Sequence, residues 1–445
     1  MSVDRIPVLI LGAGLTGLSC AHHLRSEYRL VERESEPGGI VRTRVRQGSF
    51  LCDGTGHWLH LRTDAMKKLI GSIMDGQMVE YERKAVICSK GVFTPYPFQA
   101  NTFGLPREVV LECLLGLLRA RHPEDFGLTP DTRIPRNFHE WIIRHFGDGI
   151  AKHFMVPYNE KLMGVSLREL MPEYAERFIP RPSLEDVVKG ALGFSRESLG
   201  YNAKFVYPRK GGIGALSRRL AEVLPRPPVY QTQVTRVNLG EHLASVNDGR
   251  TIGFNALVNT AALPRFIAMI EDAPEEIRGA AGQLRASTVH YFDLGVRGTG
   301  AAASHYHWIY FPEPEFVFYR AGSYSAVHAD AAPPGCRSYY IEMSGGAKDL
   351  LSDVEALKKR VLADLKRAQI LADDDEILFM ELCEIPLAYV IFDQHYEASR
   401  QRIFDYLRRH NVQSCGRWGG WGYGGMEDAL MDGKAAAEKI DKLGG

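Results

Sequence analysis

Disulfide and thiolate-metal chemistry find little support in this sequence. Its seven cysteines are scattered through 445 residues, and no two of them form a C-x-x-C pair. An odd number without such pairs is untypical of a disulfide framework or a thiolate metal site. The histidines also lack the spacing of a ligand set. We therefore expect mostly buried, reduced thiols and no bound metal.

The chain also lacks an excess of charge of either sign. Lysine plus arginine and aspartate plus glutamate each number 54. A balanced charge does not favour nucleic acid or an anionic membrane as a partner. An anionic ligand would have to be bound by a few cations gathered at one place.

Long apolar runs, repeats and low-complexity tracts are absent as well. The most apolar run, "VVLECLLGLL" at 109–118, is about half the length of a membrane span and contains Glu112, so it predicts a buried helix. Met1–Arg5 leads into an apolar strand without the features of a signal peptide, which predicts a cytoplasmic protein. The length predicts two or three domains, or one cofactor domain with large insertions.

The strongest motif lies near the start of the chain. "VLILGAGLTGLSCAHHL" predicts a strand, a glycine turn and a helix, and "YRLVERE" predicts the next strand. Gly12, Gly14 and Gly17 form G-x-G-x-x-G in that context, and Glu32 ends the second strand. The glycines allow close backbone approach, the helix start offers free N–H groups to a pyrophosphate, and Glu32 would accept hydrogen bonds from ribose hydroxyls. A glycine turn without a ligand is the alternative.

A second glycine turn bears on the choice between NAD and FAD. "EPGG" at 36–39 follows Glu32, and this region resembles flavoproteins of the amine-oxidase type, which favours FAD. Near the other end, "GRWGGWGYGG" at 416–425 precedes a helix whose N-terminus could face the negatively polarised edge of the isoalloxazine. A structural glycine loop is the alternative there.

The remaining pattern predicts an α/β protein: a Rossmann-like FAD-binding domain with a helical insertion and an antiparallel β-sheet substrate domain. Helices are expected at 107–121, 137–147, 184–192, 347–370, 397–409 and 427–442, and a strand at 377–383. Short β-rich runs at 228–260 and 288–345 predict the antiparallel sheet. The expected division is FAD-binding at 1–92, 201–285 and 386–445, helical at 93–200, and sheet at 286–385.

Several blocks point to a narrower class. "TPYPFQAN", "VPYNEKL", "AERFIPRPSL", "GYNAKFVYPRKGGIGAL", "WIYFPEPEFVFYRA" and "GRWGGWGYGG" occur in an order and spacing that resemble UDP-galactopyranose mutases, particularly the eukaryotic-type branch. The resemblance covers nearly the whole chain. It is weakly diagnostic over the first 60 residues and more specific at 94–208 and 308–320.

The resemblance implies a reaction and its participants. In this family reduced FAD interconverts pyranose and furanose forms of a UDP-sugar without net oxidation: the flavin N5 attacks the anomeric carbon and displaces UDP, the sugar ring opens and recloses, and UDP returns. The partner would be a small-molecule nucleotide sugar. NAD(P)H is a candidate external reductant. The sugar, the nucleotide and the number of subunits, including a homo-oligomer, stay open.

The resemblance also assigns roles to particular residues. Arg177 and Arg320 match a pyrophosphate-binding pair whose planar donors fork onto phosphate oxygens, and His57 matches a histidine beside the flavin. The implied cofactor-binding residues are Gly12, Gly14, Gly17, Glu32, Gly38, Gly39, Gly56, Gly416, Arg417 and Gly424. The implied substrate-binding residues are Arg83, Tyr96, Phe98, Gln99, Asn159, Met163, Asn202, Tyr310, Tyr389 and Tyr423. Taken singly, most of these residue types would be packing or ion-pair residues.

Three positions depart from the family pattern. Thr55 replaces a glycine before His57, Met163 replaces a tryptophan of the sugar-binding region, and Glu427 stands where an asparagine can lie near the phosphates. A branched residue limits backbone freedom, a lost indole removes a flat surface, and a carboxylate adds charge beside a dianion. These changes leave two alternatives open: an FAD-dependent oxidase of the amine or porphyrinogen type, and a flavoprotein with a structural or redox-sensing role.

Overall fold

The first of two large sheets is built around the N-terminal strand. The structure is a computed structural model that describes residues 4–173, 179–194, 204–344 and 349–443. The strand order is β2-β1-β11-β10-β9, with β17 also paired to β11. The strands are β1 (Asp4–Leu11), β2 (Tyr28–Val31), β9 (Val234–Asn238), β10 (Leu243–Val246), β11 (Thr251–Asn259) and β17 (Val412–Ser414).

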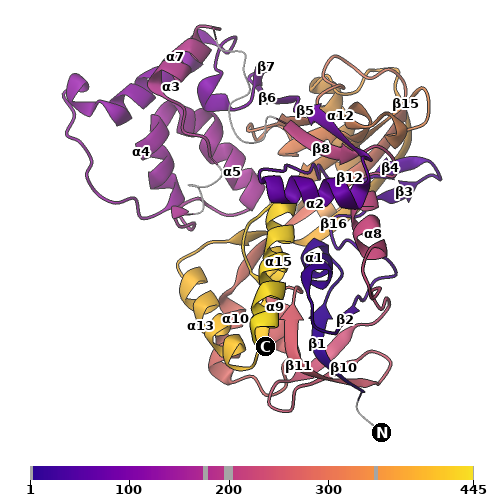
Figure 1. Ribbon diagram of the computed structural model, residues 1–445. Helices are drawn as coiled ribbons and strands as arrows, with labels where there is room; N and C mark the ends of the chain where they lie inside the picture. The colour runs from indigo at the N-terminus through magenta and orange to yellow at the C-terminus, as the bar shows by residue number, and fades with distance from the viewer. Residues whose placement is uncertain (1–3, 174–178, 195–203, 345–348, 444–445) are drawn as a thin grey trace.

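This sheet has the parallel centre of a Rossmann-like unit. β1 pairs in parallel with β2 and β11, and β11 pairs in parallel with β17. Leu9 and Ile10 of β1 are fully buried, as expected for a strand covered on both faces. The glycine turn joins β1 to helix α1 (Leu15–His23), which packs against α15 (Met426–Leu443). The two ends of the chain therefore share one layer, in the lower half of Figure 1.

The second large sheet has the order β16-β12-β15-β14-β13-β6-β7. All of its neighbouring pairs are antiparallel except β13 and β6, which are parallel. The strands are β6 (Ala85–Ser89), β7 (Val92–Pro95), β12 (Arg285–Arg297), β13 (Trp308–Tyr310), β14 (Arg320–Ser323), β15 (Cys336–Met343) and β16 (Glu376–Ile391). The predicted fold class is confirmed. The predicted division placed residues 1–92 in the FAD-binding domain and 93–200 in the helical domain. In the structure β6 and β7, which lie around residue 92, pair within the second sheet instead.

Strand β16 is much longer than the strand predicted at 377–383. It runs from Glu376 to Ile391 and contains Pro386, whose type argues against a strand interior. Two conditions permit the proline: β16 lies at the edge of the sheet, and its pairing with β12 shifts register between Ser287 and Val289. The longer strand brings Tyr389 toward the first sheet.

A helical block projects from one side of the molecule, at the upper left of Figure 1. It contains η1 (Phe98–Ala100), α3 (Arg107–Arg121), η2 (Pro123–Phe126), α4 (Phe138–Ile150), the π-helical η3 (Ala151–Met155), α5 (Val156–Met163) and α7 (Leu184–Ala191). Helix α3 buries Val109, Cys113 and Leu117 and exposes Leu111. The predicted buried helix is therefore buried along one face, where it packs against α4.

The remaining elements connect these parts. Two small ribbons pair β3 (Arg44–Arg46) with β4 (Phe50–Cys52) and β5 (Met78–Glu82) with β8 (Lys204–Pro208). The other helices are α2 (Asp64–Met74), α8 (Gly214–Glu222), α9 (Leu263–Met269), α10 (Glu275–Gln283), α11 (Tyr324–Val327), η4 (Ala329–Ala331), η6 (Asp349–Ser352), α12 (Val354–Arg367), α13 (Tyr396–Arg409) and α14 (Gly416–Gly419). All seven cysteines are free thiols. No helix in the described ranges combines the length and apolar character that crossing a membrane requires.

The segment "TPYPFQAN" is held against the helical block by one close backbone contact. A Cβ on Gly190 of α7 would lie 1.7 Å from the carbonyl oxygen of Ala100. The N–H of Phe103 donates to the Gly190 carbonyl at 3.1 Å. Only a residue without a side chain fits between α7 and η1 at this distance.

Replacing Gly190 with alanine should therefore lower the free energy of unfolding by about 1–3 kcal/mol, the range for overpacking. Gly279→Ala is the matched control, because it lies in helix α10 with no atom within 4 Å of an added Cβ. That control should gain about 0.5–1 kcal/mol from helix propensity. Chemical denaturation measures both, and equal stability of the two variants would contradict the packing described here.

Candidate functional site

One large cavity lies where the two sheets and the helical block meet. Its volume is about 1080 Å³. It extends from the glycine turn after β1 to the aromatic residues of β13 and α5, and the second glycine turn at Gly38 and Gly39 borders it. This is slightly larger than the usual range for a single small-molecule site, so it offers room for a dinucleotide and a second ligand.

The glycine-turn end has the features of a phosphate-binding helix start. Gly14 caps α1 without a side-chain hydrogen bond, so the first N–H groups of the helix remain available. A Cβ on Gly14 would meet no atom within 4 Å, because this position opens into the cavity. Gly38 donates to the Ala13 carbonyl at 2.8 Å, which places the second glycine turn beside the first.

Glu32 lies at the same end and is buried. One carboxylate oxygen accepts from the N–H of Ala13 at 2.7 Å and the other from the N–H of Glu34 at 3.0 Å. Glu32 therefore fixes the glycine turn to the end of β2. Because a carboxylate offers about four acceptor positions, it can still receive ribose hydroxyls from the cavity.

Two of the predicted glycines, Gly17 and Gly416, do not line the cavity. Their backbones pack closely against neighbouring backbone or side-chain atoms. A Cβ on Gly17 would lie 1.9 Å from the Gly12 carbonyl oxygen, so it sets the spacing between α1 and the turn. Gly416 has φ of +78°, and a Cβ there would lie 2.4 Å from the Thr16 hydroxyl. Gly416 therefore lets α14 approach the start of α1 closely.

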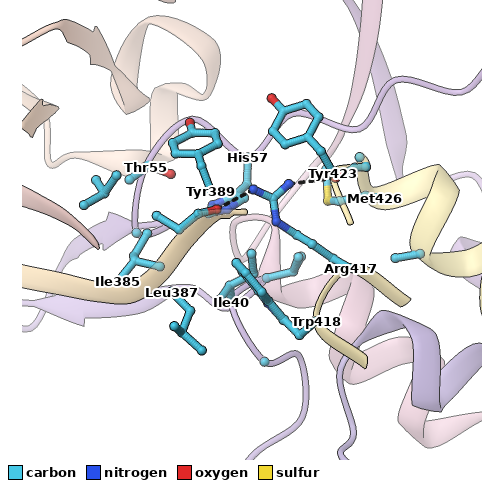
Figure 2. A pocket seen from close by; sticks show the side chains of 18 of the residues that line it. Ile40, Thr55, His57, Ile385, Leu387, Tyr389, Arg417, Trp418, Tyr423 and Met426 are labelled. Atoms are coloured by element: carbon cyan, nitrogen blue, oxygen red, sulfur yellow. Dashed lines mark hydrogen bonds between the residues drawn. The ribbon is translucent and has the colours of Figure 1, made fainter. Parts of the chain in front are cut away.

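His57 and Thr55 lie on a loop that faces the cavity (Figure 2). His57 Nδ1 lies 2.9 Å from the Asp53 carbonyl oxygen. Since a carbonyl can only accept, Nδ1 carries the proton and Nε2 is left as an acceptor. Burial lowers the pKa of His57, so the ring is neutral at pH 7.

The threonine before His57 adopts a backbone conformation that favours glycine. Thr55 has φ of +117°, an unusual value for a β-branched residue. Its N–H donates to the hydroxyl of Tyr324 at 3.0 Å, and that hydroxyl donates to buried Asp293 at 3.0 Å. A Cβ on neighbouring Gly56 would lie 2.2 Å from Trp308 Nε1, so no larger residue fits there. The substitution at 55 therefore keeps the loop shape at the expense of local strain.

Arg417 organises two of the predicted tyrosines (Figure 2). It donates to the carbonyls of Gly424 at 2.9 Å and Ala388 at 2.6 Å. Its guanidinium lies 4.8 Å from the ring centre of Tyr423 and 5.6 Å from that of Tyr389, and the two rings stack at 5.8 Å. The Nε group is buried without a partner among the described residues. This orphaned donor beside the cavity is a position at which a bound group fits.

A continuous aromatic stack forms the far wall. Tyr96 stacks on Tyr310 at 5.2 Å, and Tyr158 meets Tyr310 edge-on at 5.3 Å. Phe154 stacks on Tyr158 at 5.2 Å, and Phe98 on Phe154 at 5.0 Å. The predicted aromatic wall thus draws its rings from three separate segments of the chain. Tyr158 and Phe154 were not among the predicted residues.

Two guanidinium groups flank one indole at this wall. Arg83 lies 4.5 Å from the ring of Trp308 and 4.6 Å from the ring of Tyr96, and it donates to the Tyr310 hydroxyl at 2.6 Å. Arg320 lies 5.7 Å from the same Trp308 ring. Both arginines line the cavity, so positive charge is concentrated at one point of a charge-balanced protein.

A buried carboxylate that sequence reasoning missed holds Arg320 in place. Glu342 is 1% exposed and accepts three hydrogen bonds from Arg320, at 3.1, 2.9 and 2.6 Å. Its second oxygen also accepts from the Tyr319 hydroxyl at 2.6 Å. Burial opposes the charge of Arg320, but Glu342 outweighs it and raises the pKa of Arg320 above its usual value. These bonds use Nε and Nη2 and leave Nη1 for a ligand.

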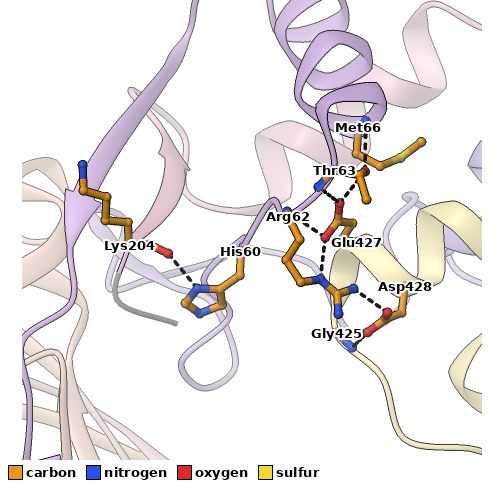
Figure 3. Close-up of polar contacts among 8 residues, drawn as sticks. All are labelled: His60, Arg62, Thr63, Met66, Lys204, Gly425, Glu427 and Asp428. Carbon is orange, nitrogen blue, oxygen red and sulfur yellow. Dashed lines mark hydrogen bonds and ion pairs between the residues drawn. The ribbon is translucent and has the colours of Figure 1, made fainter. Parts of the chain in front are cut away.

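The carboxylate of Glu427 does not add an uncompensated charge to the cavity (Figure 3). It accepts from Arg62 Nε at 2.7 Å and from the Arg62 N–H at 2.9 Å. It also accepts from the N–H and the hydroxyl of Thr63, at 2.8 and 2.7 Å. Burial disfavours its charge, yet these bonds outweigh burial and lower the pKa of Glu427. Glu427 therefore ties the start of α15 to the segment before α2.

The other predicted residues fall into three groups. Gln99 and Asn159 line the cavity, and each amide nitrogen donates to a backbone carbonyl, of Pro180 at 2.8 Å and of Met155 at 2.7 Å. Phe98, at the end of the aromatic stack, and Met163 are fully buried and do not line the cavity, so the structure gives them packing roles in place of the predicted ligand contact. Arg177 and Asn202 lie outside the described residues.

The residues present fit the predicted flavin dinucleotide. The uncapped helix start, the open position at Gly14 and the acid at Glu32 suit its diphosphate and ribose. Arg417, with its orphaned Nε, lies farther along the same cavity beside Ile40, Leu387, Trp418 and Met426, which supply apolar contact surface (Figure 2). The cavity then continues to Arg83 and Arg320.

Known structures share this fold. A crystal structure of reduced UDP-galactopyranose mutase superimposes with a TM-score of 0.90 at 25% identity, over 98% of this chain and 94% of that one. Putrescine oxidase bound to putrescine superimposes with a TM-score of 0.68 at 17% identity, over 99% of this chain and 100% of that one. A fatty acid isomerase from P. acnes gives 0.64 at 13% identity, over 99% of each chain. The last two share the fold alone.

The family comparison covers almost the entire chain. A model of flavin containing amine oxidoreductases matches residues 15–441. That range begins at the start of helix α1, includes the whole second sheet and every strand of the first sheet except β1, and ends within helix α15. The cofactor expected from the glycine turns is therefore a flavin, FAD, as the family and the similar mutase structure support. The chain belongs to the family of flavin-containing amine oxidoreductases.

Proposed function

We propose that this protein is a flavin-dependent mutase that interconverts the pyranose and furanose forms of a UDP-sugar. The observation that carries the proposal is the placement of Arg83 and Arg320 beside one indole, Trp308, in the cavity that also holds the glycine turn. Guanidinium groups suit a diphosphate because their planar donors fork onto its oxygens. The likeness to reduced UDP-galactopyranose mutase supports the same assignment.

The cofactor would lie along the cavity from Glu32 to Arg417. The first and second glycine turns would hold its diphosphate, Glu32 a ribose, and the region around His57, Arg417 and Gly424 its ring system. Reduced FAD would supply the electron pair that displaces UDP from the anomeric carbon, and no net oxidation would result. We propose that NAD(P)H is the external reductant and that the chain belongs to the eukaryotic-type branch of these mutases.

Arg320 and Arg83 would bind the diphosphate and stabilise the charge that develops as UDP leaves. Glu342 orients Arg320 and neutralises one of the two positive charges. The group formed by Arg83, Arg320 and Glu342 therefore keeps one net positive charge, which attracts a dianion. Arg177 would complete this group, as the resemblance implies. A preorganised donor to developing charge is worth about 2.7–4 kcal/mol in the barrier.

The aromatic stack would bind the uracil ring. Tyr96 and Tyr310 offer ring faces, and Gln99 and Asn159 offer amide groups at the same wall. Asn202, Tyr389 and Tyr423 complete the proposed substrate side. His57 is neutral, and its Nε2 can accept a hydrogen bond from a group bound in the cavity.

An amine oxidase is the second candidate, because the family contains amine oxidoreductases. A protonated amine is a cation. Arg83 and Arg417 line the cavity without a carboxylate partner among the described residues, and their positive charge would repel such a substrate. The same charges attract a nucleoside diphosphate, so the electrostatics favour the mutase.

The proposal is tested by incubating UDP-galactofuranose with the oxidised and the dithionite-reduced protein and following the products by chromatography. We expect conversion to the pyranose form by the reduced protein alone, without oxygen uptake. Turnover by the oxidised protein with oxygen consumption would instead establish an oxidase.

Arg320→Ala should reduce turnover by about 10²–10³-fold, because a preorganised donor to the leaving group is lost. The content of bound FAD should stay unchanged, since Arg320 belongs to β14 of the second sheet, whereas the glycine turns and Glu32 belong to the first. Arg320→Lys should recover only part of the activity, because a lysine lacks the planar fork.

Arg297→Ala serves as the control for that series. Arg297 ends β12 of the same sheet and forms an exposed ion pair with Glu376. Steady-state kinetics and the flavin absorbance of each purified variant give both quantities. Wild-type turnover in Arg320→Ala would refute its role at the leaving group.

A further inference from the structure

Lys161 is a half-buried lysine whose ammonium, among the described residues, binds backbone carbonyls and no carboxylate. It lies on α5, next to the cavity-lining residues Asn159 and Leu162. Its Nζ donates to the carbonyl oxygens of Phe318 at 2.8 Å, Phe311 and Glu313 at 2.9 Å, and Phe316 at 3.0 Å. An ammonium has three N–H donors, so it is shared among four acceptors in a closed cage.

Enclosing an ammonium in such a cage costs free energy, because burial disfavours the charged form. Burial lowers the pKa of Lys161 to about 7, while the carboxylates of Glu313, Asp364 and Glu315 act in the opposite direction. The four carbonyl dipoles favour the charged form as well. Because the acceptors all belong to one loop, residues 311–318, the ammonium organises the loop backbone as a bound cation would.

This loop connects the two strands that carry the proposed phosphate-binding wall. β13 ends at Tyr310 and β14 begins at Arg320. On the opposite side, Tyr158 of α5 lies 5.3 Å from the Tyr310 ring and 6.2 Å from the Tyr319 ring. Lys161 therefore links the helical block to the β13–β14 connection directly behind the site.

The other side of the loop is held independently. Arg367 donates to the Glu315 carbonyl at 2.8 Å, and the Val317 N–H donates to Asp364 at 3.0 Å. These contacts come from α12, which belongs with the second sheet. Within the part of the chain that the structure describes, the hydrogen bonds from Lys161 are those that connect the loop to the helical block.

We propose that Lys161 is a positioning residue: its ammonium fixes loop 311–318 to α5 and thereby sets the distance between the Arg320-bearing strand and the aromatic wall. This inference rests on the proposed function for its ligand, a nucleoside diphosphate. It predicts that removing the ammonium loosens the loop and weakens diphosphate binding while the cofactor end stays intact.

The test compares Lys161→Met with the wild-type holoenzyme. Methionine keeps a similar length without the charge or the donors. We expect hydrogen exchange of the amides in 311–320 to quicken about tenfold or more, and the Kd for UDP to rise by a similar factor, because hydrogen bonds from charged groups are the strong class. The content of bound FAD should not change.

Lys152→Met is the matched control, since this lysine lies on adjacent η3 and pairs with Glu112 at the surface. It should match the wild type in exchange and in UDP binding. Lys161→Gln restores two N–H donors and should give a Kd between those of the wild type and Lys161→Met. If the methionine variant does not fold, the glutamine variant tests the proposal.

Unchanged exchange and an unchanged Kd in both Lys161 variants would overturn the proposal. If the wild-type protein does not bind UDP at all, the proposed function fails, and the exchange comparison still decides the link. Faster exchange in 311–320 then supports the link between Lys161 and the loop, and exchange at the wild-type rate overturns it.

Discussion

The site depends on the register of three neighbouring strands in the second sheet. Tyr310 of β13 is paired with Arg320 of β14, and Arg320 is paired with Glu342 of β15. A shift of one residue in either pairing would turn the side chains to the opposite face. The register thus places a phenol, a guanidinium and its counter-ion in one row, although they belong to three different strands. Everything that we propose for phosphate binding starts from this row.

Charge compensation follows from the same row. A buried guanidinium without a partner is costly, and a fully neutralised one would not attract a dianion. Glu342 binds two of the nitrogen atoms of Arg320 and leaves the third available, while Arg83 is held by cation–π contacts and a phenol. The cavity therefore keeps a net positive end. The carboxylate of Glu427 is compensated by Arg62 instead, and this ion pair holds the start of α15 in place.

Two of the three departures from the mutase pattern have a structural explanation. Glu427 has four hydrogen bonds and acts as a tether. Met163, the last residue of α5, is packed in the core and leaves Leu162 and Asn159 as the neighbouring cavity residues. Thr55 is different, because its φ of +117° is strained for a branched residue beside the expected flavin.

The sequence by itself determined the elements whose signals are local. The glycine turn, Glu32 and the helices predicted at 107–121 and 397–409 follow from periodicity, capping and turn chemistry, which act over a few residues. Trp308 was also within reach, because it shares a strand face with Tyr310 two residues on. Only the tertiary structure decided that Glu342 meets Arg320, that Phe98 and Met163 face the core, that β6 joins the second sheet, and that Lys161 closes a loop 150 residues away. These facts depend on pairing between distant segments, and no local pattern encodes the partner that a buried polar group finds when the sheets and the helical block come together.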